Sequence, residues 1–244
     1  LNAIIGLSKL AQRPEVSSET IDEYIKKIQN SGEQLLTLVN DILDVSRLEH
    51  GRGNSLNYIS MNICKCVREN VDLFREQAAS ENKVLTDEYE VHFPHVYCDP
   101  SRLSQILNNL ISNAMKYSHE GAKIHVSLKE LNHQPGHSKY QITVQDTGIG
   151  MAKEYLANIF EPFSREATFT ANKVTGTGLG MPIVKTLIQQ MSGEITVSSE
   201  LGKGSTFIVT LPLQNLEEED ELETAETEHP ADDFTLEGKT LLLA

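Results

Sequence analysis

This sequence has few cysteines and no long apolar run, and it lacks basic residues in a stretch near its end. Among 244 residues no run approaches the roughly 20 apolar residues that span a bilayer, so we expect a soluble chain that meets a membrane only through segments outside it. Three cysteines are too few for a disulfide framework, and Cys64 and Cys66, two apart on a helix, would point to different faces. We therefore expect no cysteine metal site and a reducing, cytosolic compartment. The first residues show neither an initiating Met nor a charged leader, which predicts a piece of a longer protein.

Lysine and arginine are missing from positions 217–233, which hold ten Asp and Glu residues. We predict that 215–236 is a solvated acidic linker. Removing these ten charges from the net charge of −14 leaves −4, so the charge decides little about what the folded part binds. We predict no nucleic-acid partner. After the linker, 237–244 begins a new apolar strand.

An apolar stripe runs along 18–49 at alternating steps of three and four residues. This spacing predicts a long amphipathic helix with a coiled-coil-like face. A shorter helical piece at 1–11 precedes it, and Arg13-Pro14-Glu15 separates the two. A helix pair with one apolar seam is too thin to be stable alone, so we expect 1–50 to dimerise as a four-helix bundle. The alternative is a helical linker packed on its own domain. The stripe consists of Ile21, Tyr24, Ile25, Ile28, Leu35, Leu38, Val39, Ile42 and Val45.

The region 51–214 mixes short strands with helices, which predicts an α+β fold, a two-layer α/β sandwich with a mixed sheet packed on helices. The stretch 50–54, with two glycines, marks its start. Its best-signalled helix begins after Asp99, a favoured N-cap residue, with Pro100 at the first helical position, and continues to about Tyr117. We expect strands at 55–61, 84–89, 96–98, 122–131, 139–145, 194–199 and 205–211, and helices at 62–79, 153–159 and 179–191.

Four motifs within this region carry the chemistry, although each is weak when taken singly. A glycine pair after a strand is more often a turn, and a polar helix position is usually solvated. Together they indicate a ligand site. They are 109–117 (Asn-Leu-Ile-Ser-Asn-Ala-Met-Lys-Tyr), 146–150 (Asp-Thr-Gly-Ile-Gly), 159–163 (Ile-Phe-Glu-Pro-Phe) and 176–180 (Gly-Thr-Gly-Leu-Gly).

The first two motifs offer ligands for a metal ion and an amine. Asn109 and Asn113 lie four residues apart and share a helical face, with Lys116 beside them. Amide oxygens next to a cation suit a Mg²⁺ ion that keeps several waters and bridges phosphates. Asp146 ends a strand before two glycines, so its carboxylate can face a pocket and accept from an amino group such as that of adenine. An Asx-turn that merely opens a loop is the alternative.

The last motif favours phosphate. The loop 176–180 runs directly into a predicted helix, so backbone N–H groups and the helix N-terminus would face a shared anion. It is not a Walker loop, because no Lys-Ser or Lys-Thr follows the last glycine, and its glycine spacing differs from the dinucleotide fingerprint. We therefore predict a phosphate cradle of another family.

The order of these motifs resembles the ATP-binding domain of histidine kinases, within the superfamily shared with DNA gyrase and the MutL mismatch-repair ATPases. The resemblance covers about 56–213 and implies Mg²⁺ and ATP as ligands. Lys116-Tyr117 and Phe160-Glu161-Pro162-Phe163 favour the kinase branch. The opening string Leu1-Asn2-Ala3-Ile4-Ile5-Gly6 favours it too, because it is similar to the end of the family's phosphoacceptor motif, His-Glu-Leu-Arg-Thr-Pro-Leu-Asn-Ala-Ile-Ile-Gly.

The resemblance implies a role for each residue near the phosphates. Asn113 would ligate Mg²⁺, Asn109 would orient the phosphates and Lys116 would contact one of them. Arg165, in a mobile lid at 164–175, would steady the γ-phosphoryl group. The phosphate cradle would consist of Gly176, Thr177, Gly178, Leu179 and Gly180.

The resemblance also implies how the base is held. Asp146 would accept a hydrogen bond from the adenine amine, Thr206 would support Asp146 through a water, and the ring of Tyr117 would lie against adenine. The remaining site residues are two glycines behind the carboxylate and two phenylalanines that anchor the lid: Gly148, Gly150, Phe160 and Phe163.

The implied reaction is in-line transfer of the γ-phosphoryl group to a histidine, which the protein promotes mainly by positioning and by neutralising charge. None of the eight histidines has the Glu-Leu-Arg-Thr-Pro context, so we expect the acceptor upstream of Leu1 and a chain that cannot phosphorylate itself. The segment 238–244 is similar to the first strand of a receiver domain, which predicts a hybrid kinase that relays the group to a receiver aspartate. The rival interpretations are a clamp-forming ATPase of the same superfamily and a non-catalytic nucleotide-binding module.

Overall fold

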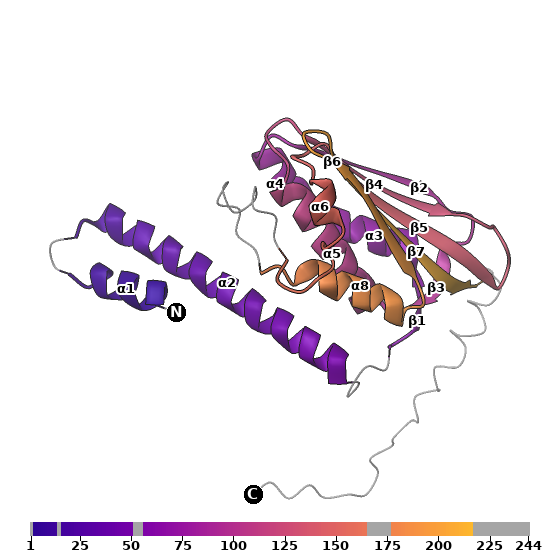
Figure 1. Cartoon of the computed structure of the whole chain (residues 1–244), viewed down its shortest axis with the longest axis horizontal. Helices are drawn as coiled ribbons and strands as arrows, with labels where there is room; N and C mark the ends of the chain where they lie inside the picture. The colour runs from indigo at the N-terminus through magenta and orange to yellow at the C-terminus, as the bar shows by residue number, and fades with distance from the viewer. Residues whose placement is uncertain (1, 14–15, 51–55, 165–176, 217–244) are drawn as a thin grey trace, which may run out of the picture.

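A helical hairpin is followed by a mixed sheet that helices cover on one face, as a computed structural model of the chain shows (Figure 1). The structure describes residues 2–13, 16–50, 56–164 and 177–216. Among the helices of these ranges, none is long and apolar enough to cross a membrane. The expected α+β architecture with an N-terminal helical region is confirmed.

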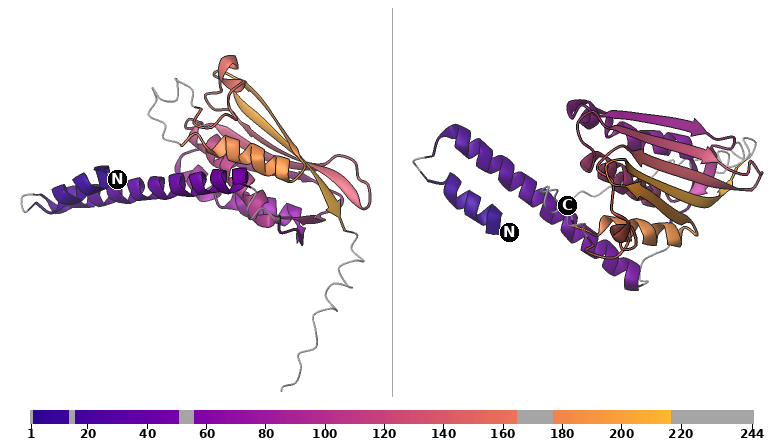
Figure 2. Two further views of the ribbon diagram at one scale, coloured as in Figure 1. Left: turned by 60° about the horizontal axis from the view of Figure 1, so that its bottom comes forward. Right: turned by 45° about the horizontal axis from the view of Figure 1, so that its top comes forward.

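The hairpin consists of α1 (Asn2–Ala11) and α2 (Ser18–His50), which lie side by side and antiparallel (Figure 2). The hydroxyl of Ser17 accepts from the backbone N–H of Thr20 at 3.3 Å and so satisfies a donor in the first turn of α2. The C-terminal part of α2 passes along α8 (Gly180–Gln190). Several apolar side chains of α2 remain exposed: Ile25, Leu35, Leu36, Val39 and Leu43.

Seven strands form one sheet in the order β1-β3-β7-β5-β4-β2, with β6 also paired to β7. β2 runs parallel to β4, and the other pairings are antiparallel. The sheet is therefore mixed, as expected. The strands are β1 (Ile59–Asn62), β2 (Val84–Glu90), β3 (His95–Cys98), β4 (Lys123–Glu130), β5 (His137–Asp146), β6 (Glu194–Glu200) and β7 (Gly204–Asn215).

The helices α3 (Ile63–Asp72), α5 (Pro100–Lys116) and α8 pack their apolar faces against one side of the sheet and enclose the core. The predicted cap of α5 is confirmed, because Oδ1 of Asp99 accepts from the N–H of Arg102 at 3.1 Å. Oδ2 of the same carboxylate accepts from the N–H of Asn57 at 2.9 Å. Asp99 thus joins the chain that enters the domain to the start of α5.

Three predicted elements differ from the structure. The strand expected at 55–61 begins only at Ile59, as β1. The single helix expected at 62–79 is divided into α3 and α4 (Arg75–Ser80), and the break falls at Phe74 and at Leu73, which is 70% exposed. The helix expected at 153–159 is the one-turn α6 (Lys153–Leu156). The boundary at 51–55, the acidic linker and the final strand lie outside the described residues, so the domain limits 1–50, 51–214, 215–236 and 237–244 stay predictions.

Candidate functional site

Asp146 is the last residue of β5 and is 6% exposed. Burial raises the pKa of its carboxyl above the ordinary value, although N–H groups of Gly148 and Ser205 donate to it and oppose that shift. The N–H of Gly148 lies 2.8 Å from Oδ1. Among the described residues no cation pairs with this carboxylate. A desolvated carboxylate of this kind is suited to accept from a neutral donor on a ligand.

Gly148 brings this carboxylate to the C-terminal end of α5. A Cβ atom placed on Gly148 would lie 2.4 Å from the carbonyl oxygen of Tyr117 and 2.8 Å from Oδ1 of Asp146, closer than atoms can approach. The next residue, Ile149, donates its N–H to the same Tyr117 carbonyl at 3.0 Å. Glycine is therefore required for the strand end to reach the helix end, and the first two motifs meet there.

Gly180 brings the glycine loop to the same helix. Nδ2 of Asn109 donates to the carbonyl of Gln105 at 2.9 Å, which directs its Oδ1 away from that turn. A Cβ on Gly180 would lie only 2.7 Å from this Oδ1. Any side chain at 180 would therefore displace Asn109, so the N-terminus of α8 and the asparagine face of α5 are in direct contact.

The phenylalanine motif joins the loop through its last residue. Phe163 has a positive φ of 62° and donates its N–H to the carbonyl of Gly178 at 3.0 Å. Gly178 also has a positive φ, of 73°, and a Cβ placed on it would lie 3.0 Å from backbone atoms of Phe163. Thr177 accepts from the N–H of Leu179 at 3.2 Å. All four motifs thus meet around the C-terminal half of α5 and the start of α8.

Further contacts order the aromatic rings of these motifs. Nζ of Lys116 lies over the ring of Tyr117, 5.0 Å from its centre, and Nζ of Lys185 on α8 lies 5.4 Å from the centre of the Phe160 ring. Lys185 is a contact that the motifs did not predict, since it stands in no recognisable pattern. The predicted residues Arg165 and Gly176 and most of the lid at 164–175 lie outside the described residues.

The residue of β7 that shares a face with Asp146 is Ser205 rather than Thr206. Ser205 is paired directly with Asp146 and is buried, whereas Thr206 is paired with the exposed Gln145. Side chains alternate between the two faces of a strand, so Thr206 points away from Asp146. The register therefore favours Ser205 over the predicted Thr206 as the residue beside the carboxylate. Phe207 belongs to the core, and Ser205 lies two residues before it on the same strand. Ser205 therefore faces the same side of the sheet as Phe207.

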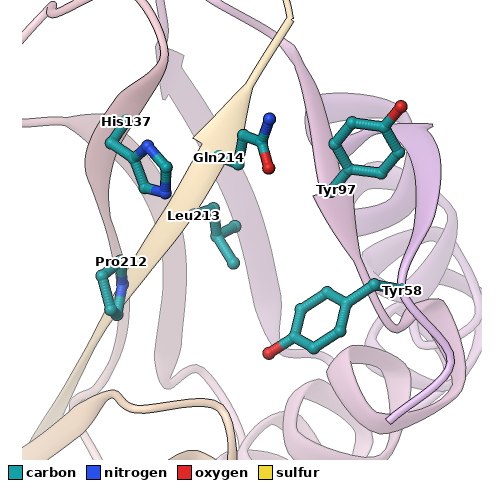
Figure 3. Close-up of a pocket in the computed structure, with 6 residues that line it drawn as sticks. All are labelled: Tyr58, Tyr97, His137, Pro212, Leu213 and Gln214. Carbon is teal, nitrogen blue, oxygen red and sulfur yellow. The ribbon is translucent and has the colours of Figure 1, made fainter.

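A pocket of about 460 Å³ lies at the other end of the sheet (Figure 3). His137, at its rim, is the first residue of β5 and Asp146 the last, so about 30 Å of strand separates the two places. None of the predicted site residues lines it. It is not the place where the four motifs meet. Its lining consists of Tyr58, Tyr97, His137, Pro212, Leu213 and Gln214.

Two sequence profiles match the chain in sequence order. Residues 1–51 match the His Kinase A (phospho-acceptor) domain, and residues 98–215 match the histidine kinase-, DNA gyrase B- and HSP90-like ATPase. The chain belongs to the sensor histidine kinases. The predicted family, and its kinase branch, are thereby confirmed.

Relatives of this kinase chain agree with the assignment. The autoinducer 2 sensor kinase/phosphatase LuxQ of Vibrio parahaemolyticus is 32% identical over 246 residues, which is 100% of this chain and 28% of LuxQ. The sensor protein GacS of Pseudomonas syringae is 35% identical over 91% of this chain and 24% of its own length. The chain therefore spans less than a third of either relative.

Among solved structures, full-length ShkA in complex with AMPPNP has a TM-score of 0.68 at 28% identity, over 88% of this chain and 43% of ShkA. The fold, with its helical region and its ATPase-like domain, is shared with these kinases. The nucleotide analogue AMPPNP is bound to ShkA in that structure.

Proposed function

We propose that the chain binds Mg-ATP where its four motifs meet and that this site transfers the γ-phosphoryl group to a histidine of a phosphoacceptor helical hairpin. The observation that carries the proposal is the contact of Asn109 with Gly180, together with the approach of Asp146 to the end of α5. A carboxylate for the base and a glycine loop for the phosphates are thereby placed at one helix. The binding of AMPPNP by the related ShkA supports the choice of nucleotide.

Each side chain then has a task set by its position. The buried Asp146 accepts from the adenine amine, and Ser205 on the adjacent strand holds a supporting water. Tyr117 lies against the base and Lys116 turns to a phosphate. Backbone N–H groups at the start of α8 face the phosphates, where the helix dipole favours negative charge. Phe160 and Phe163 hold the lid and Arg165 steadies the transferred group. Gly148, Gly150, Gly178 and Gly180 give the close approaches.

Magnesium fits the residues that are present. Within the described ranges no group of three His, Cys, Asp or Glu side chains could hold a metal ion, so an all-protein cage is not the design of this site. Asn113, one turn after Asn109 on α5, offers an amide oxygen, and Mg²⁺ commonly takes few protein ligands plus phosphate oxygens and water. When bound, the ion neutralises phosphate charge, while Asn109 and Lys116 orient the triphosphate.

The acceptor histidine needs its own test. The match to the phospho-acceptor domain over 1–51 does not support our expectation of an acceptor upstream of Leu1, since it suggests that the histidine is present. His50, the last residue of α2, is the one histidine at positions 1–51. The inability of the chain to phosphorylate itself therefore stays a prediction.

Incubation with γ-labelled ATP and Mg²⁺, alone and with a separate hairpin that carries the His-Glu-Leu-Arg-Thr-Pro segment, decides this point. We predict acid-labile label on the added hairpin only. Label on the chain itself that His50→Ala removes would place the acceptor at His50. Tight ATP binding without label on either protein would favour a non-catalytic nucleotide module over a kinase.

Two partners follow from the proposal. The exposed apolar side chains on α2 would be buried in a homodimer with a four-helix bundle, as coiled-coil-like faces require. A receiver domain would take the phosphoryl group onward, in cis if 237–244 begins one. The related kinase ThkA, in a crystal structure with the response regulator TrrA, has a TM-score of 0.66 at 25% identity, over 86% of this chain and 57% of that one. A cytosolic location also remains a prediction.

A further inference from the structure

Ser118 carries a buried hydroxyl that the fold leaves unpaired. The residue follows Tyr117, the C-cap of α5, and is 8% exposed. Its Oγ has no hydrogen-bond partner in the part of the chain that the structure describes. Buried hydroxyl groups are nearly always paired, because an unpaired one has lost its water without compensation. Such a group needs an explanation, and its surroundings supply one.

The hydroxyl borders the same space as the carboxylate of Asp146. A Cβ atom placed on Gly148 would lie 2.9 Å from Oγ of Ser118 and 2.8 Å from Oδ1 of Asp146. Both oxygens therefore lie within 2.9 Å of one point, the empty Cβ position of Gly148. Oxygens arranged in this way can both reach one ligand edge or be bridged by one water about 2.8 Å from each.

The carboxylate of Asp146 and the hydroxyl of Ser118 differ in whether they can donate a hydrogen bond. An ionised carboxylate only accepts hydrogen bonds, whereas a serine hydroxyl donates one. Adenine presents a donor, its exocyclic amine, directly beside an acceptor, N1. Guanine presents the reverse at these positions, an oxygen acceptor beside an N–H donor. When Asp146 accepts from the amine of adenine, the hydroxyl of Ser118 beside it is a donor of the kind that N1 can accept.

We propose that Ser118 is a specificity-determining residue whose hydroxyl donates to N1 of adenine, directly or through one water shared with Asp146. This inference rests on the proposed ATP-binding function and adds to it a second side chain that recognises the base. It also accounts for the unpaired Oγ, which gains its partner when the base enters. A purely structural serine would instead act only on the stability of the domain.

The test compares ATP with 1-deaza-ATP, in which a C–H group replaces N1, on the whole chain by equilibrium binding. Ser118→Ala should bind ATP about three- to tenfold more weakly than the wild type, as expected for one neutral hydrogen bond. It should bind 1-deaza-ATP as the wild type does. Ser118→Thr, which keeps the hydroxyl, should retain the preference for ATP. Ser127→Ala removes an equally buried serine from β4 and should change neither affinity.

The ratio of the two affinities decides the matter, because it does not depend on the fraction of folded protein. An unchanged ratio in Ser118→Ala would overturn the inference, whether both affinities fall together or neither falls. Should that variant not fold, Ser118→Cys, a weak donor of similar size, must show the same loss of ratio. Failure of the wild type to bind ATP at all would instead refute the proposed function.

Discussion

Asp146→Asn tests the base-binding half of the site with little change in shape. The wild-type carboxylate is buried at the end of β5 and accepts from the N–H of Gly148. The amide of asparagine has the same size but presents one oxygen and one NH₂ group. If its oxygen keeps the bond from Gly148, its NH₂ group faces the adenine amine, so that two donors meet.

The expected loss of ATP affinity in Asp146→Asn follows from the negative charge that the substitution removes. A hydrogen bond to a charged group contributes about 1.5–3 kcal/mol, which corresponds to about 10- to 150-fold in affinity. Burial places the effect toward the upper end, because no bulk water can replace the lost acceptor. The fold should survive, since the change removes a carboxyl whose pKa burial already raises, that is, a charge that the folded state holds at a cost.

The assay is titration with ATP and Mg²⁺ by isothermal calorimetry, with thermal unfolding in the absence of nucleotide as a check on the fold. Asp87→Asn is the matched control, since Asp87 lies in the same sheet but pairs with Arg75 at 2.6 Å on the edge strand β2. We expect the control to bind ATP as the wild type does. Equal affinity of Asp146→Asn and wild type would refute the assignment of the carboxylate to the base.

Three further predictions concern the helix contact, the buried acid and the dimer. Gly180→Ala should weaken ATP binding in the same titration without unfolding the domain, because the new Cβ displaces Oδ1 of Asn109. Burial opposes ionisation of Glu130, but bonds from Ser138 and from the N–H groups of Phe93 and His92 outweigh it and lower its pKa. Its stabilising effect is thus present above about pH 4.5 and lost as the pH falls through the lowered pKa, and Glu130→Gln should flatten the curve of melting temperature against pH in that window. Leu43→Glu should convert a dimer to monomer in sedimentation velocity, since Leu43 is a large exposed apolar side chain of α2.

Each of these has a contrary outcome. Unchanged affinity of Gly180→Ala would mean that Asn109 does not orient the phosphates. An acid unfolding curve of Glu130→Gln that overlays the wild type would remove Glu130 from the account of acid stability. A dimer that resists Leu43→Glu, or that dissociates equally with the exposed-site control Lys26→Glu, would remove the proposed interface.

Local signals predicted most of the fold. The Asp99 cap, Pro100 and the apolar stripe were enough for α5, and alternation gave β4, β5 and β7. The break between α3 and α4 could not be predicted, since neither glycine nor proline marks Leu73 and Phe74. There the second helix packs against β2, a tertiary contact that the local sequence does not signal.

The site was predicted only as a set of motifs. The site depends on contacts between residues far apart in sequence, which no local pattern contains. Examples are the contact of Asn109 with Gly180 and the close approach of Gly148 to Tyr117 at the end of α5. Ser118 was missed for the same reason, because a lone serine after a helix gives no signal until the strand end returns to bury it. The role predicted for Thr206 stays a prediction, although the register of β7 favours Ser205 as the neighbour of Asp146.

A crystal structure of the chain with AMPPNP and Mg²⁺ tests the central claim most directly. We predict the adenine amine within hydrogen-bond distance of Asp146, N1 facing Ser118, and the phosphates at the start of α8 with the metal at Asn113. Nucleotide bound instead in the pocket between Tyr58, Tyr97 and Gln214, at the other end of the sheet, would contradict the account.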